Sequence, residues 1–265
     1  MTQLAHAVVL VRRLLRVQVM NELQYRANFV MQIFQAALSL GVSLTIVVVV
    51  FEQVDQLNGW SRPELIILVG VFTLVGGLLR MIVRPNMNLL VMDVYRGTLD
   101  YVLTKPVDSQ LLLSIREIRI WQLVDVLAGA GTIGWGVVAT GGRVGLVDSL
   151  MFAAALVLGM VILYCFLFSL ICTAFWFVRV KEIAELFESV TQAARWPLSI
   201  YPSWIRFGLT FVVPVAFAIT LPAQALLSRL SWLALLGELV LTCGFLAFTR
   251  WFFRMALRRY TGASA

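Results

Sequence analysis

Long apolar runs, interrupted by short polar connections, dominate this sequence of 265 residues. A membrane-spanning helix needs about 20 mostly apolar residues, because a rise of about 1.5 Å per residue must cross about 30 Å of hydrocarbon. Five runs meet that requirement, at about 27–51, 63–83, 120–140, 148–177 and 232–253. The pattern therefore predicts an all-α integral membrane protein.

Residues 179–230 break this pattern with four prolines, at Pro197, Pro202, Pro214 and Pro222. One reading is a plain membrane helix over 206–227, although two of the prolines would bend it. The other is a spanning helix over 181–197 followed by a broken, re-entrant hairpin over 203–228. We prefer the second reading, and both give six transmembrane helices.

Local signals mark the two ends of the second span. Ser61 is followed three residues later by Glu64, a capping-box pattern, and Pro63 favours the first turn of a helix. Pro85 disfavours a helical conformation of Arg84, so the helix is expected to end or kink there. Residues 84–118 then form the longest polar interruption between spans.

Composition indicates the class of protein, and the distribution of basic residues indicates its orientation in the membrane. Hydrophobic residues make up 61% of the chain and charged residues 13%, with a mean hydropathy of +0.91, which excludes an ordinary soluble domain. Seventeen Lys and Arg residues, Arg195 among them, fall on one side of the predicted membrane. Arg206 is unassigned, and the other side has only Arg62, Arg143 and Arg229. The positive-inside rule therefore places both termini in the cytoplasm, in a multi-pass protein of the cell inner (cytoplasmic) membrane.

The net charge of +7 has a second consequence, for the partners of the chain. The basic residues lie in short stretches between apolar runs, so we expect them to face membrane lipid and not nucleic acid. The first 26 residues carry arginines in a moderately amphipathic pattern and do not resemble a signal peptide. We predict an amphipathic elbow helix over 1–26 on the cytoplasmic leaflet.

Two acids, Asp125 and Glu238, fall well inside predicted spans. An ionisable group at membrane depth is a candidate functional residue, so both are candidates for a translocation pathway. Asp125 lies at a depth similar to that of Arg80, which favours a structural ion pair. Glu238 has no obvious partner, and neutral burial or pairing with Arg206 or Arg229 are the alternatives. Acids in an apolar cavity would suit amphiphilic cations.

Small residues are concentrated in the third span. Ala130 and Gly134, and likewise Thr132 and Gly136, are small residues four apart, the spacing that close helix packing requires. Packing within the chain is the preferred explanation, and a subunit interface is the alternative.

The centre of the segment 84–118 mixes aromatic and charged residues between helix breaks. Gly97 can end one short helix, and Lys105-Pro106 can stop the next. A compact element of this kind suits docking into a groove on a cytoplasmic protein, although an ordinary solvated loop is the alternative. The candidate interface residues are Tyr95, Arg96, Gly97, Leu99, Asp100, Tyr101, Lys105 and Pro106.

Six short segments stand out as landmarks along the chain. They are residues 23–29 (LQYRANF), 58–61 (NGWS), 97–107 (GTLDYVLTKPV), 196–202 (WPLSIYP), 213–217 (VPVAF) and 221–223 (LPA). In these landmarks the chain resembles the permease subunit of an ABC-2-type ABC transporter, in the branch formerly of unknown function. The resemblance implies a six-helix exporter permease with an amino-terminal elbow helix, a coupling helix between spans two and three, and a re-entrant hairpin before the last span.

The resemblance also implies that partner chains bind ATP and complete the transporter. No phosphate-binding G-x-x-x-x-G-K-[ST] motif occurs, so ATP and Mg are expected in a separate cytoplasmic ABC ATPase dimer. No catalytic residues, metal ligands or cofactor-binding residues are predicted here, since His6 is alone and the three cysteines lie in apolar runs. A second permease chain, identical or paralogous, is expected to complete a dimer.

The expected function is that of a permease that moves a small hydrophobic or amphiphilic compound out of the cytoplasm. Two alternatives remain open. One is an ion-coupled secondary transporter, although inverted halves with matching broken segments are not evident. The other is a non-transporting membrane assembly factor built on a permease scaffold.

Overall fold

The computed structural model describes the backbone of residues 26–141, 144–177 and 180–260. These ranges are almost entirely helical, and within them a single bridge between Leu57 and Trp60 is the extent of strand-like pairing. Five helices are long and apolar enough to cross a membrane, and a bent helix pair would raise the count to six. The prediction of an all-α integral membrane protein is confirmed. The predicted elbow helix over 1–26 falls almost wholly outside the described residues.

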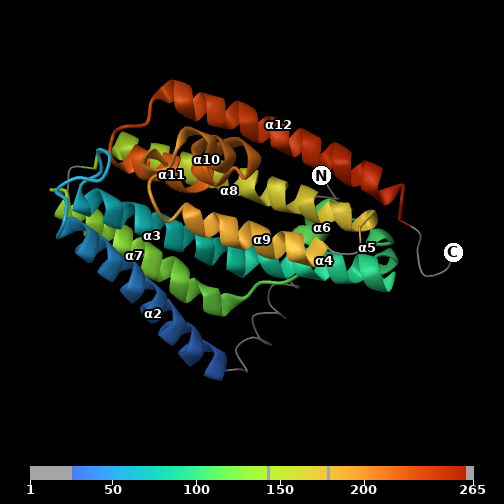
Figure 1. The fold of residues 1–265 in the computed structure, drawn as a ribbon. Coiled ribbons are helices and arrows are strands. Elements are labelled where there is room, and N and C mark those ends of the chain that lie inside the picture. The colour runs from blue at the N-terminus through green and yellow to red at the C-terminus, as the bar shows by residue number, and fades with distance from the viewer. Residues whose placement is uncertain (1–25, 142–143, 178–179, 261–265) are drawn as a thin grey trace.

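The long helices lie side by side as an elongated bundle (Figure 1). They are α2 (Arg26–Phe51), α3 (Arg62–Leu78), α7 (Leu123–Ala139), α8 (Leu146–Cys172) and α12 (Trp232–Leu257). The connections α2–α3, α7–α8 and α11–α12 meet at one end of the bundle, called here the Trp60 end. The short helices α5 (Asp100–Leu103) and α6 (Ser109–Ser114) lie toward the opposite end, called the α5 end.

The second span continues without interruption past the predicted stop at Pro85. A π-helical turn (Leu79–Val83) joins α3 to α4 (Arg84–Arg96), and together they form one helix of 35 residues. A proline has no N–H and leaves the carbonyl four residues earlier without its helical donor. Here that carbonyl belongs to Met81, and the backbone N–H of Arg119 donates to it over 2.9 Å. The expected helix end is therefore wrong, because the α6–α7 connection satisfies the group that the proline leaves unpaired.

Glycines set the close approach of α7 to α3. A Cβ atom added at Gly129 would lie 2.5 Å from the backbone nitrogen of Leu74, and one at Gly136 would lie 2.6 Å from Cγ1 of Ile67. Thr132 is buried in the same contact, whereas a Cβ atom at Gly134 would meet nothing within 4 Å. Packing within the chain is thus confirmed for the Thr132 and Gly136 pair. The Ala130 and Gly134 pair lies on the exposed side of α7.

The proline-rich stretch forms a hairpin, and the straight helix over 206–227 is excluded. Helix α10 (Ser203–Phe207) with its π-helical extension to Val212 is bent by 101° from α11 (Val215–Leu226). Both flanks of this pair contact the α2–α3 connection: the Asn58 amide donates to the Ser199 carbonyl over 3.0 Å, and Arg229 donates to the Gly59 carbonyl over 3.3 Å. The chain therefore enters and leaves the hairpin at the same end, the Trp60 end.

Helix α9 (Val180–Ala193) carries the chain from the α5 end toward this hairpin (Figure 1). It has 14 residues and ends four residues before the expected 197, so it rises only about 21 Å. Turns over residues 194–196 and a 3-10 helix (Leu198–Ile200) complete the passage. The expected helix is present but shorter than a full span.

Candidate functional site

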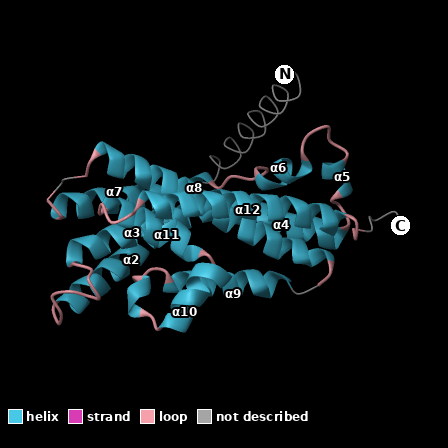
Figure 2. Cartoon of the chain, turned by 90° about the horizontal axis from the view of Figure 1, so that it is seen from above, coloured by secondary structure: helices cyan, strands magenta, loops and turns pink. Residues whose placement is uncertain are grey.

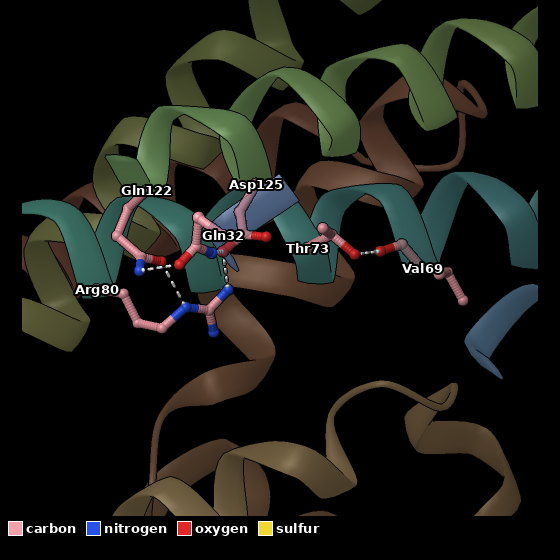
Figure 3. A network of polar contacts seen from close by, with 6 residues as sticks. All are labelled: Gln32, Val69, Thr73, Arg80, Gln122 and Asp125. Carbon is pink, nitrogen blue, oxygen red and sulfur yellow. Dashed lines mark hydrogen bonds and ion pairs between the residues drawn. The ribbon is translucent and has the colours of Figure 1, made fainter. Parts of the chain in front are cut away.

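A polar network joins the start of α2, the π-helical turn that follows α3, and the start of α7 (Figure 3). Arg80 donates to Asp125 over 2.9 Å and, through Nε, to Gln122 over 3.0 Å. Gln32 donates to the same carboxylate over 2.9 Å and accepts from Gln122 over 2.9 Å. The predicted ion pair between Arg80 and Asp125 is therefore confirmed, and two glutamines that hydropathy does not single out complete it.

Small residues of α3 make room for this network. A Cβ atom at Gly77 would lie 3.0 Å from Cβ of Asp125, and one at Gly76 would lie 3.2 Å from Nη1 of Arg80. The Asp125 side chain is 7% exposed and that of Arg80 is 34% exposed. A nearly buried carboxylate is stable only when paired and hydrogen-bonded, and Asp125 has both an arginine and an amide.

Two adjoining cavities share Arg80 and together form what we call the polar cavity. The smaller, of about 190 Å³, is lined by Gln32, Ser39, Thr73, Asp125, Gln192 and Arg195 among others. The larger, of about 550 Å³, extends along α4 and α9 and includes Arg84, Met92, Arg119, Glu185 and Phe187. The polar cavity thus runs along the 35-residue helix from α4 to the middle of α3.

Arg195 lies at an unexpected depth in this cavity. The sequence groups it with the basic residues on the cytoplasmic side, but its guanidinium carbon lies 5.1 Å from the centroid of the Phe72 ring. Phe72 is ten residues beyond Arg62, or about 15 Å along the helix, which is about half of the hydrocarbon thickness. Arg195 therefore lies against the middle of α3, apart from the basic residues of α4 with which the sequence groups it.

The segment between α4 and α6 stands out from the bundle at the α5 end (Figure 2). Gly97 ends α4 with a left-handed backbone (φ 66°), as expected. Tyr101 is 77% exposed, and exposed side chains surround it at Tyr95, Arg96, Lys105 and Pro106, with Asp100 half-buried.

Leu99 is the exception among the candidate interface residues. Its side chain is fully buried in the main apolar core, together with Val102 and Leu112. It cannot present that side chain to another protein, so its assignment to a docking surface is wrong. Alternation of apolar and polar residues in a four-residue helix does not reveal which side faces the bundle.

Two ion pairs tie this segment to the bundle. Arg116 donates to Asp93 over 2.7 Å, and the Thr98 hydroxyl donates to the same carboxylate over 2.9 Å. Asp108 caps α6 by accepting from the Leu111 N–H over 3.0 Å, and it accepts from Arg250 of α12 over 2.9 Å. The hydrogen bond from Arg250 lowers the pKa of the Asp108 carboxyl below its usual value. The segment is thus anchored at its base and exposed at α5.

Glu238 has a different environment from Asp125. It is 1% exposed, and neither carboxyl oxygen has a hydrogen-bond partner among the described residues. Arg206 donates instead to backbone carbonyls of 198–201, and Arg229 donates to Glu64 and Gly59. Pairing with either arginine is therefore excluded, and Glu238 is not among the residues that line the polar cavity.

These features define a multi-pass membrane protein with a polar cavity inside an apolar bundle and an exposed element at one end. The family model described as "ABC-2 family transporter protein" matches residues 37–264, which is most of the chain. The chain belongs to this family, so it is an ABC transporter permease. Comparison with curated proteins and with solved structures gave no match.

Proposed function

We propose that this chain is the membrane-spanning subunit of an ATP-driven exporter that moves a small hydrophobic or amphiphilic compound out of the cytoplasm. The observation that carries the proposal is the polar cavity, which reaches Phe72 and Thr73 in the middle of α3, in a chain of the ABC-2 family. A purely structural membrane protein has no need for charged groups at that depth, where they are costly.

ATP hydrolysis would take place in a separate ATPase dimer that docks at the α5 end. Tyr101 is the exposed aromatic anchor of that docking element, and buried aromatic residues commonly dominate such interfaces. This assignment places the α5 end in the cytoplasm, together with the basic residues of α4 and of the end of α12.

The 35-residue helix supplies a mechanical link between docking and transport. Tyr95 and Arg80 lie on this one helix, on opposite sides of Pro85. The π-helical turn Leu79–Val83 contains Arg80, and such turns often occur at functional sites. Closure of the ATPase dimer would move α4, shift Arg80, and so convert the cavity between inward-open and outward-open states. A second permease chain would form the other half of the pathway.

The test is ATP-dependent transport by the purified permease and ATPase in proteoliposomes, with a panel of amphiphilic compounds. We expect transport that requires ATP and that stops when the ATPase carries an inactivating Walker-motif substitution. Transport that continues with the inactive ATPase would overturn the proposal.

The buried carboxyl of Glu238 favours one rival function, that of an ion-coupled secondary transporter. The same vesicles distinguish the two. Dissipating the proton and sodium gradients with ionophores abolishes ion-coupled transport, whereas it leaves ATP-driven transport in place.

A further inference from the structure

We infer that the polar cavity binds the negatively charged head of an amphiphile, and that Arg195 is the residue that binds it. This inference rests on the proposed export function and names its substrate class. The proposed ligand is an anion, whereas Asp125 and Glu238 alone would favour a cationic ligand.

The first step is the balance of charge in the cavity. The carboxylate of Asp125 is bound to Arg80 and to the amide of Gln32, so it has little remaining capacity to attract a cation. Arg119, at the α4 end, is bound to Glu117 over 3.3 Å. Among the side chains that the structure describes, no carboxylate lies within 4 Å of Arg195. Among the described side chains that line the smaller cavity, the charge left uncompensated is therefore positive.

The second step concerns the donors of Arg195. A guanidinium has five N–H groups and no acceptor. One nitrogen, Nη2, donates to Gln192 over 3.0 Å, and Nε is buried with no partner in the described chain. A carboxylate or phosphate can accept two parallel hydrogen bonds from such a group, which is the geometry that distinguishes Arg from Lys.

The third step is the way the arginine is held. Phe72 lies beneath the guanidinium at 5.1 Å, and an aromatic face attracts a cation at this distance. The ring neither neutralises the charge nor occupies the remaining N–H groups. The arrangement fixes Arg195 at the cavity wall while leaving donors for a ligand.

The fourth step is the place for an apolar tail. The larger cavity, of about 550 Å³, has room for such a tail. Toward the α5 end, Met87, Leu167 and Phe187 line the larger cavity. A ligand with one anionic group and an alkyl or aryl body meets both kinds of surface.

The probes are radiolabelled dodecanoate and radiolabelled dodecyltrimethylammonium, which share an alkyl chain and differ in charge. Binding is measured to the full chain in phosphatidylcholine nanodiscs, with empty discs subtracted. We expect dodecanoate to bind about tenfold more tightly than the cation, and Arg195→Gln to remove that advantage, because hydrogen bonds to a charged group are lost. Equal binding of the two probes, or unchanged dodecanoate binding by Arg195→Gln, would overturn the inference.

Three further variants keep this result interpretable. Arg195→Lys retains the charge and should recover part of the dodecanoate affinity. Phe72→Leu should weaken it by about threefold, since it removes the aromatic face. Arg206→Gln is the matched control, because Arg206 donates only to backbone carbonyls outside the cavity, and it should bind as the wild type does. Loss of binding in Arg206→Gln equal to that in Arg195→Gln would contradict a specific site.

Transport separates this inference from the function on which it rests. If ATP-driven export of cations proceeds normally in Arg195→Gln, the proposed function holds and the anion site is wrong. If dodecanoate binding depends on Arg195 but no ATP-dependent transport occurs with any compound, the site holds and the export function fails.

Discussion

Asp125 and Glu238 are both buried acids at membrane depth, yet their surroundings differ. Asp125 accepts from an arginine and a glutamine at the edge of a polar cavity, while Glu238 has no partner for either oxygen in the described part of the chain. A buried charge without a partner is far more costly than a neutral carboxyl group. The comparison indicates that Asp125 belongs to a paired polar network, whereas Glu238 is a packed side chain whose carboxyl oxygens have no partner among the described residues.

The largest expected effect comes from removing the arginine of the network. Arg80→Leu leaves the Asp125 carboxylate nearly buried without its cation, and we expect a loss of about 3 kcal/mol of stability. Thermal unfolding in detergent measures it. The double variant Arg80→Leu with Asp125→Leu should regain most of the loss, because no charge then remains. A double variant as unstable as the sum of its parts would show that the two residues act independently.

The segment between α4 and α6 contrasts with both buried acids, because its candidate interface residue Tyr101 is exposed and would act by contacting another protein. Tyr101→Ala should weaken binding of the ATPase by about 2 kcal/mol, as loss of an aromatic anchor commonly does. Lys105→Ala, on the same exposed segment, should cost less than about 1 kcal/mol. Co-purification and substrate-stimulated ATP hydrolysis provide the measurement. Equal effects of the two variants would remove Tyr101 as the anchor.

Asp108 provides a third kind of acid, paired but partly exposed. Its side chain and that of Arg250 are each 39% exposed, so the pair should contribute about 1 kcal/mol or less. Because the hydrogen bond from Arg250 lowers the pKa of Asp108, this contribution is present above the unfolded pKa of about 4 and is lost as the pH falls through the lower, folded value. The stability difference between wild type and Arg250→Gln should be constant above about pH 5 and shrink below about pH 4. A difference that grows in acid would contradict this sign.

The smallest effect is expected at Glu238. Glu238→Gln keeps the shape of the side chain and removes no ion pair or hydrogen bond seen among the described residues, so the stability should change by less than about 1 kcal/mol. Asp125→Asn is the matched comparison, and it should cost more because Arg80 loses its counter-charge. A larger loss for Glu238→Gln than for Asp125→Asn would reverse the assignment of the two acids.

The sequence predicted the spans well, because twenty apolar residues leave a signal that depends only on local composition. It also predicted the hairpin, since prolines such as Pro214 prevent a straight helix. The ion pair of Arg80 with Asp125 followed from their similar depths. In each case the composition of a short stretch, or its position along a span, was sufficient for the prediction.

Other features depend on contacts between segments that are far apart in the sequence. No local pattern of residues indicates such contacts. Gln32 and Gln122 lie 90 residues apart, and an amide in an apolar run has no characteristic spacing. The neighbours of Arg195 along the chain do not reveal that its guanidinium lies over Phe72 on another helix. Continuation of the second span past Pro85 depends on the Arg119 N–H, which comes from a later connection.

The central claim is that the polar cavity opens and closes with the nucleotide state of the ATPase. Gln192 is exposed and lines the smaller cavity, so Gln192→Cys reports access to it. Cys243 is exposed and is replaced by Ser, whereas Cys165 and Cys172 are buried. Labelling by a membrane-impermeant maleimide from the cytoplasmic side should fall several-fold when the complex is held with ATP. Labelling that is the same with and without ATP would contradict the claim.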